Sequence, residues 1–236
     1  MKILALDSSG MVASAAIAQD EILLAEYTVN YKKTHSQTLL PMVDEIVRMT
    51  ELDLETVDYI AVAAGPGSFT GLRIGSATAK GLGLALNKPL IGVPTLEGLA
   101  YNLAGADKLV CPMMDARRSQ VYTGIYRSKK EGLEAVLPQT AIGVEELIQK
   151  INQAGEPVIL LGDGVPVYLN LLEKGLLVPF ETAPLHLNRQ RAASIAALGM
   201  IYAKEGRVET AQEHRPQYLR LSQAERERMA KEAAER

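Results

Sequence analysis

Residues 65–83 constrain the fold of this chain more than any other stretch, because a glycine loop and a helical pattern meet there. They read GPGSFTGLRIGSATAKGLG and follow a short apolar run, residues 60–64, that predicts a buried strand. Pro66 breaks the chain, and a helix is expected from Thr70 to about Leu86. A strand, a glycine loop and a helix start, in this order, can present backbone N–H groups to an anion.

The predicted helix carries small residues at every fourth position, on two neighbouring stripes. The three glycines in its interior should cost the helix roughly 3 kcal/mol relative to alanine. We therefore expect another element to lie very close to the helix backbone. The first stripe contains Gly71, Gly75, Ala79 and Gly83, and the second contains Ala77, Gly81 and Ala85.

The composition describes a chain that can bury a core and has no excess of positive charge. Its 236 residues are 47% hydrophobic and 22% charged, with a formal net charge of -3. A protein that grips nucleic acid by itself normally carries a basic patch, so direct RNA binding is not expected. The single Cys111 excludes an internal disulfide and fits a reducing compartment. Without a signal-peptide pattern or a long apolar run, we expect a soluble cytoplasmic protein.

Three short strands joined by tight turns begin the chain and predict an antiparallel meander. Helices and further strands then alternate, which predicts a mixed sheet flanked by helices. The predicted strands are residues 2–6, 12–18, 22–29, 60–64 and 89–93, and the predicted helices are residues 34–49, 70–86 and 96–103.

Asp7 ends the first predicted strand and is followed by Ser8 and Ser9 in a turn. A carboxylate at this strand end could hold a metal–phosphate complex. The simpler interpretation, which we favour, is that Asp7 and Ser8 stabilise the turn by hydrogen bonds to the backbone. His35 lies at the start of the first helix, but Leu39 stands where a helical metal site needs its second ligand. We predict that His35 makes a local hydrogen bond.

The glycine loop matches none of the common phosphate-binding motifs. It lacks the Lys-Ser or Lys-Thr pair of a P-loop. Gly65, Gly67 and Gly71 leave three residues where the dinucleotide fingerprint needs two. Arg73 is the single charge of the first helical turn, and it could reach a phosphate, contact a partner's carboxylate or lie on the surface.

The second half repeats the organisation of the first. Residues 109–114 and 120–126 predict a hairpin whose turn begins with Asp115, as the first turn begins with Asp7. We take this as a sign of internal duplication. The predicted divisions are a subdomain of residues 1–104, a second of residues 105–220, and a charged tail of residues 221–236; the other predicted elements are a strand at 157–161 and helices at 144–151, 165–172 and 188–203.

Two halves that each begin with a hairpin and an Asp-led turn are similar to the actin/Hsp70/sugar-kinase (ASKHA) fold, an α/β class with two duplicated mixed-sheet subdomains. Within it, the chain resembles the TsaB (YeaZ-like) family of bacterial tRNA threonylcarbamoyladenosine biosynthesis proteins, inactive paralogues of the TsaD/glycoprotease family. The DARR turn and the absence of His-x-x-x-His favour TsaB over TsaD. The matching segments span nearly the full length and read LALDSS, HSQ with LLP, GPGSFTGLRIG with AKGL, VPTLEGLA, PMMDARRSQVY and PQYLR.

The resemblance implies a part in making threonylcarbamoyladenosine, the modified base beside the tRNA anticodon. In that family, TsaD carries the metal and transfers the threonylcarbamoyl group from threonylcarbamoyl-adenylate to tRNA, and an ATPase, TsaE, joins the complex. The resemblance implies that this chain is a non-catalytic subunit that binds TsaD or a second copy of itself and reaches tRNA only indirectly. No metal or cofactor is expected on the chain alone, and ATP or ADP would sit at the interface of the complex.

The resemblance places the partner surface on the helices that begin at Thr34 and Thr70, and docking there would explain the glycines. We therefore expect Gly75→Leu and Ala79→Leu to leave the monomer folded and to abolish pairing. The predicted partner-binding residues are His35, Leu39, Leu40, Val43, Thr70, Arg73, Ile74, Gly75, Ala77, Thr78, Ala79 and Leu82. The residues predicted to form a vestigial nucleotide site are Asp7, Ser8, Ser9, Gly65, Gly67, Ser68 and Asp115.

Two enzymatic alternatives stay open beside this interpretation. An ATP-binding phosphotransferase or ATPase of the same fold would need paired glycine-rich phosphate loops, of which Asp7, Asp115 and residues 162–164 are only fragments. A metallopeptidase would need a metal triad, and the three histidines stand too far apart in the sequence to predict one.

Overall fold

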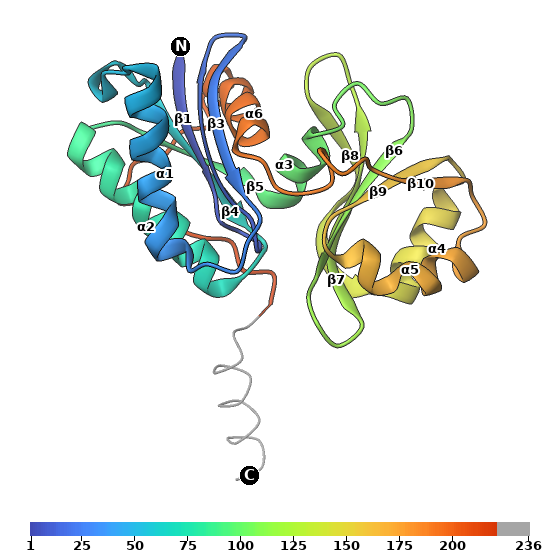
Figure 1. Ribbon diagram of the computed structural model, residues 1–236. Helices are drawn as coiled ribbons and strands as arrows, with labels where there is room; N and C mark the ends of the chain where they lie inside the picture. Colours follow the sequence, from blue (N-terminus) through green and yellow to red (C-terminus); the bar gives the residue numbers. More distant parts are fainter. Residues whose placement is uncertain (221–236) are drawn as a thin grey trace, which may run out of the picture.

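The computed structural model describes residues 1–220 and divides into two lobes, each built on one five-stranded sheet (Figure 1). The strand order is β3-β2-β1-β4-β5 in the first lobe and β8-β7-β6-β9-β10 in the second. In both sheets an antiparallel three-stranded meander is followed by two parallel strands. This shared order confirms the predicted duplication. The predicted tail, residues 221–236, lies outside the described residues.

The elements of the two lobes follow one another along the chain, apart from the last helix. The first lobe contains β1 (Lys2–Asp7), β2 (Ala13–Gln19), β3 (Ile22–Val29), α1 (His35–Thr50), the 3₁₀ turn Leu54–Thr56, β4 (Tyr59–Gly65), α2 (Phe69–Leu86), β5 (Leu90–Pro94) and α6 (Ala192–Lys204). The second contains β6 (Leu109–Asp115), β7 (Gln120–Ser128), β8 (Leu133–Gly143), α4 (Val144–Ala154), β9 (Val158–Leu161), α5 (Gly164–Gly175) and β10 (Phe180–Thr182), and α3 (Thr95–Tyr101) lies between the lobes.

The first sheet is buried on both faces, which explains its continuous apolar strands. Alternate residues of β1 point to opposite faces: Leu4 and Leu6 pack into the core beneath α1 and α2, whereas Ile3 and Ala5 pack against α6. Within residues 1–220, no helix is both long and apolar enough to cross a membrane.

The position of α6 corrects the predicted division of the chain. Residues 105–220 were expected to form the second subdomain, but α6 returns to the first sheet, where Ile195 shares a core with Ile3. Gly199 makes the approach close, since a Cβ at this residue would lie 3.0 Å from the Cβ of Ala61. The first lobe is therefore built from both ends of the described chain.

Candidate functional site

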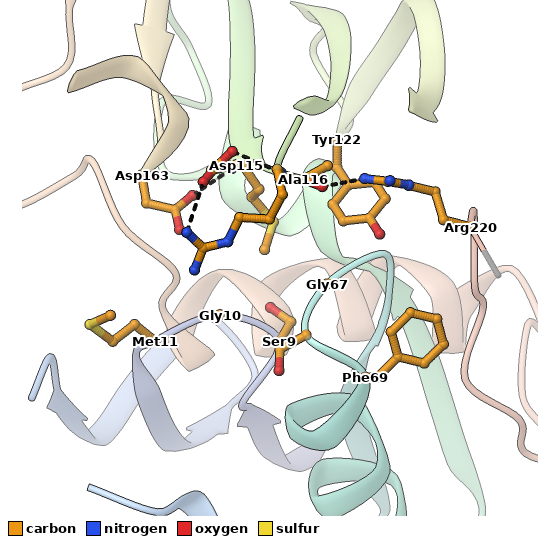
Figure 2. Close-up of a pocket in the computed structure, with 13 residues that line it drawn as sticks. Ser9, Gly10, Met11, Gly67, Phe69, Asp115, Ala116, Tyr122, Asp163 and Arg220 are labelled. Atoms are coloured by element: carbon orange, nitrogen blue, oxygen red, sulfur yellow. Dashed lines mark hydrogen bonds and ion pairs between the residues drawn. The ribbon is translucent and has the colours of Figure 1, made fainter. Parts of the chain in front are cut away.

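A cleft of about 420 Å³ lies between the two lobes (Figure 2). Ser9 and Gly67 reach it from the first lobe, and Asp115 and Tyr122 reach it from the second. In an open two-lobed α/β fold, such an interlobe cleft is the default place for a ligand. The chemistry of the cleft depends on how the glycine loop and the Asp7 turn are arranged at its floor.

The glycine loop rests directly on the turn that follows β1. A Cβ at Gly71 would lie 2.1 Å from the carbonyl oxygen of Ser8, and a Cβ at Gly67 would lie 2.3 Å from that of Ser9. The Ser68 N–H donates to the Ser9 carbonyl at 2.7 Å, and the Ser8 hydroxyl donates to the Gly71 carbonyl at 2.9 Å. These glycines are required because two backbone segments of the same chain touch.

Three backbone N–H groups of the loop are also used inside the chain. The Gly65 N–H donates to the Thr95 hydroxyl at 3.1 Å, and the Gly71 N–H donates to the Ser68 hydroxyl at 3.3 Å. Together with the Ser68 N–H, these groups have partners in the protein. An incoming phosphate would have to break these bonds before it could use the same groups.

The rest of the first glycine stripe also faces its own lobe. A Cβ at Gly75 would lie 2.5 Å from the Ser8 hydroxyl oxygen, and one at Gly83 would lie 2.4 Å from a methyl group of Leu90. Ala79 is fully buried in the core. The prediction that Gly75→Leu and Ala79→Leu leave the monomer folded is therefore wrong, since either leucine would enter filled space.

Asp7 lies under this contact, 1% exposed. One carboxylate oxygen accepts hydrogen bonds from the Ser9 N–H at 2.9 Å and from the Ser9 hydroxyl at 2.6 Å. Burial raises the pKa of Asp7 from 3.8 to about 6, and the bonds from Ser9 counteract only part of that rise. These bonds agree with the favoured interpretation of Asp7 as a turn-stabilising residue. Ser8 differs, because it ties the turn to α2.

The second turn presents polar side chains to the other wall of the cleft. The carboxylate of Asp115 accepts bonds from the Arg117 N–H at 2.9 Å and from the Tyr168 hydroxyl at 3.0 Å. Asp163 in turn accepts a bond from the Asp115 N–H at 3.2 Å, and its burial raises its pKa. Residues 117–119 all adopt positive φ angles, and the Arg117 side chain, 87% exposed, lines the cleft with a guanidinium nitrogen 3.8 Å from the Asp115 carboxylate.

The structure brings together only part of the predicted nucleotide site. Ser9, Gly67, Ser68 and Asp115 line the cleft. Asp7, Ser8 and Gly65 lie beneath it and are buried. The cleft also contains residues that were not predicted: Phe69, Tyr122, Asp163 and Arg220. Asp163 could have been found from the sequence, because it stands between two glycines directly after a predicted strand. Arg220 could not, because it lies 104 residues along the chain from its partner Ala116.

The predicted partner helices are only partly accessible. His35 is half-buried and donates from Nε2 to the carbonyl of Gly10 at 2.8 Å, which joins α1 to the Asp7 turn. Four predicted contact residues are buried within the lobe and cannot touch a partner in this arrangement: Leu39, Val43, Gly75 and Ala79. The exposed ones are Leu40, Thr70, Arg73 and Ala77, and the half-buried ones besides His35 are Ile74, Thr78 and Leu82.

The second small-residue stripe of α2 faces outward. Ala77, Gly81 and Ala85 are exposed, and a Cβ at Gly81 would meet nothing within 4 Å. This stripe, which we call the α2 ridge, carries no large side chain that would hold a neighbouring helix away. The exposed apolar side chains Leu40 and Leu84 lie on the same two helices, α1 and α2.

Residues 208–220, which we call the C-terminal strap, run along one flank of α2. The rings of Phe69 and Tyr218 stack at 4.7 Å with their planes 8° apart. Arg73 donates to the Tyr218 hydroxyl at 3.4 Å, and Lys80 donates to the His214 carbonyl at 3.2 Å. Among residues 1–220, the α2 ridge therefore stays uncovered between α1 on one side and the strap on the other.

Metal ligands are not grouped in the part of the chain that the structure describes: no three His, Cys, Asp or Glu side chains there could hold one ion. His35 has Leu39 on the next helical turn, and that leucine is 1% exposed in the core. Cys111 is buried, and burial raises the pKa of its thiol to about 12.

Comparison with known proteins decides the family. The family model TsaD, described as tRNA N6-adenosine threonylcarbamoyltransferase, matches residues 22–228. The tRNA threonylcarbamoyladenosine biosynthesis protein TsaB of Bacillus subtilis is 34% identical over 225 residues, covering 95% of this chain and 96% of that relative. The chain belongs to the TsaB family. This confirms the predicted resemblance.

Solved structures agree with this assignment. A Pseudomonas aeruginosa protein described as similar to peptidase YeaZ superposes with a TM-score of 0.81 at 26% identity, covering 93% of this chain and 99% of that one. Component A of the (R)-2-hydroxyglutaryl-CoA dehydratase of Acidaminococcus fermentans superposes with a TM-score of 0.50 at 12% identity, covering 88% and 99%. The second likeness concerns the fold alone, and the predicted ASKHA fold is confirmed.

Proposed function

We propose that this TsaB-family chain is a non-catalytic subunit in the biosynthesis of threonylcarbamoyladenosine in tRNA, and that it acts by binding the catalytic subunit TsaD. The name of the Bacillus subtilis relative, 34% identical along almost the whole chain, supports the pathway. The observation that carries the docking role is the outward α2 ridge of Ala77, Gly81 and Ala85, between α1 and the strap.

The α2 ridge suits a helix as its partner. The distance between two packed helices is set by the side chains at their contact, so a ridge of small residues permits a short distance. Leu40 and Leu84 are 54% and 57% exposed, and a helix on the ridge would bury their apolar side chains at the rim of the contact. Removing this apolar surface from water would favour binding. We assign the ridge to a helix of TsaD, whose fold would offer the equivalent helices; a homodimer would use the same ridge symmetrically.

The floor of the cleft supports a role without chemistry of its own. The loop that would cradle a phosphate is occupied by Ser8 and Ser9, and one oxygen of Asp7 is committed to Ser9. We therefore place the metal and the transfer step on TsaD, expect TsaE to join the complex, and expect tRNA to be reached through the complex in the cytoplasm.

Gly81→Arg should leave the monomer folded and abolish pairing with TsaD. The new side chain has open space at Gly81 in the monomer but would stand in the helix contact. We expect the dissociation constant, measured by titration calorimetry, to rise at least about 100-fold, since overpacking a buried contact costs about 1–3 kcal/mol and the arginine charge would also be desolvated. Threonylcarbamoyl transfer to tRNA, measured with TsaD and threonylcarbamoyl-adenylate, should fall in parallel.

Gln153→Arg is the matched control, because it adds the same side chain to an exposed position of α4 in the other lobe. It should pair and support transfer as the wild type does. A folded Gly81→Arg protein that binds TsaD and supports transfer normally would contradict the proposed docking surface.

The enzymatic alternative has a separate test. The purified chain should not turn over ATP at an enzyme-like rate in the absence of TsaD and TsaE. Rapid ATP turnover that is lost in Asp7→Asn, a variant that keeps an oxygen acceptor for Ser9, would overturn the non-catalytic proposal.

A further inference from the structure

The C-terminal strap joins the two lobes at the cleft. It is fixed to the first lobe by paired backbone hydrogen bonds between Glu209 and Leu90, at 2.8 and 2.9 Å, and by the Gln217 N–H donating to the Ala64 carbonyl at 2.7 Å. The contact with β4 is tight, since a Cβ at Gly65 would lie 2.2 Å from the Gln217 carbonyl oxygen. The strap is therefore an integral part of the first lobe up to this point.

The next residues cross to the second lobe. The side chain of Gln217 accepts a bond from Gln139 of β8 at 3.3 Å. The Arg220 guanidinium donates to the carbonyl of Ala116, which belongs to the Asp115 turn (Figure 2). A hydrogen bond from a charged donor is stronger than one between neutral groups. Arg220 also lines the cleft itself, so opening the cleft would separate it from Ala116.

The chain passes between the lobes at a second place, beside α3. Asn102, just after α3, donates to the carbonyls of Leu187 and Arg189 at 2.8 and 2.7 Å, which ties the outgoing and returning connections together. These bonds join the two connections beside α3, where a hinge between the lobes would lie. The strap is a separate attachment between the lobes.

We propose that residues 217–220 form a latch that holds the interlobe cleft closed, and that a partner on the α2 ridge stabilises the closed arrangement. The second part rests on the proposed function. It follows from Tyr218, which stacks on Phe69 and accepts a bond from Arg73 at the start of α2. Any contact that fixes Arg73 and Tyr218 also fixes Arg220, two residues further along the strap. Docking and cleft closure are thereby coupled.

The latch can be tested in the chain alone by distance measurements between spin labels. Met49→Cys and Leu177→Cys place labels at exposed positions of the first and second lobes, 68% and 85% exposed, and the native Cys111 is fully buried. The wild type should give one narrow distance distribution. Arg220→Ala should raise the ratio of open to closed molecules about tenfold and add a longer distance, because a charge-assisted hydrogen bond is lost.

Arg215→Ala is the matched control, because within residues 1–220 Arg215 donates to the carbonyls of Gln212 and His214, both in the strap, and not to the second lobe. It should keep the wild-type distances. Thermal unfolding of both variants checks that neither is unfolded, and removal of residues 216–236 gives an independent loss of the latch. Identical distance distributions for Arg220→Ala and Arg215→Ala in folded proteins would overturn the latch.

Addition of TsaD tests the coupling. Gln139→Ala weakens the latch but keeps Arg220, so saturating TsaD should lower the open fraction of this labelled protein, whereas Arg220→Ala should stay open. TsaD that binds Gln139→Ala without lowering its open fraction would overturn the coupling. Failure of TsaD to bind the wild type would contradict the proposed function instead, and the measurements on the chain alone decide the latch in either case.

Discussion

Gly71→Ala should destabilise the folded chain by about 3 kcal/mol or more, whereas Gly81→Ala in the same helix should stabilise it by up to about 1 kcal/mol. The first Cβ would lie 2.1 Å from the backbone oxygen of Ser8, which cannot move without displacing β1. The shift would also strain the buried bond from the Ser8 hydroxyl to the Gly71 carbonyl. The second Cβ meets nothing and only removes the glycine's conformational freedom.

Urea denaturation of the two variants and the wild type measures both effects. The two sites act as controls for each other, because the substitution and the helix are the same and only the surroundings of the Cβ differ. Equal changes in the free energy of unfolding for the two variants would show that the glycine loop does not rest on the Asp7 turn.

Asp7→Asn should change how stability depends on pH. Burial raises the pKa of Asp7 from 3.8 to about 6 in the folded chain, so the folded state binds this proton more tightly than the unfolded state. The free energy of unfolding therefore falls as pH rises from about 4 to 6, by about 3 kcal/mol from this group, and the loss is complete above that range. Asparagine keeps an oxygen for Ser9 but does not titrate.

The stability of the variant relative to the wild type should accordingly rise by about 3 kcal/mol between pH 4 and pH 7. Urea denaturation at a series of pH values measures this difference, and the other titrating groups cancel in it. Asp44→Asn, on the exposed side of α1, is the matched control. A difference that does not vary with pH would contradict the buried, proton-binding state of Asp7.

The sequence revealed most strands because the central ones are buried on both faces. Runs such as residues 60–64 are apolar throughout, and β4 occupies Tyr59–Gly65. β8, Leu133–Gly143, was not predicted, because Pro138 in its middle argues against a strand. It is an edge strand of its sheet, where proline can be tolerated because one side needs no ladder hydrogen bond.

The two small-residue stripes of α2 could be predicted from the sequence, but their surroundings could not. Its period correctly predicted that something approaches the backbone closely, but a period defines a stripe and not the element that faces it. The stripe with Gly71 and Gly75 meets the chain's own Ser8, and the stripe with Gly81 faces outward. Composition does not separate these two stripes, since both consist of glycine and alanine.

The remaining differences between the predicted and the observed structure come from contacts between residues far apart in the sequence. α6 was expected in the second subdomain because it follows that part in sequence, yet it packs on the first sheet beside Ile3. Arg220 and Tyr218 reach the cleft and α2 from the end of the described chain. No local pattern marks such contacts, because they depend on where the chain returns.

The contact between the glycine loop and the Asp7 turn has a consequence for the affinity of the chain for a partner. A protein that must order its loops when a partner binds loses part of the binding free energy to that ordering. Here Ser8 and Ser9 already hold the first turn of α2 in place. The docking surface is thus ordered in advance, so binding a partner should cost little conformational entropy in this part of the chain.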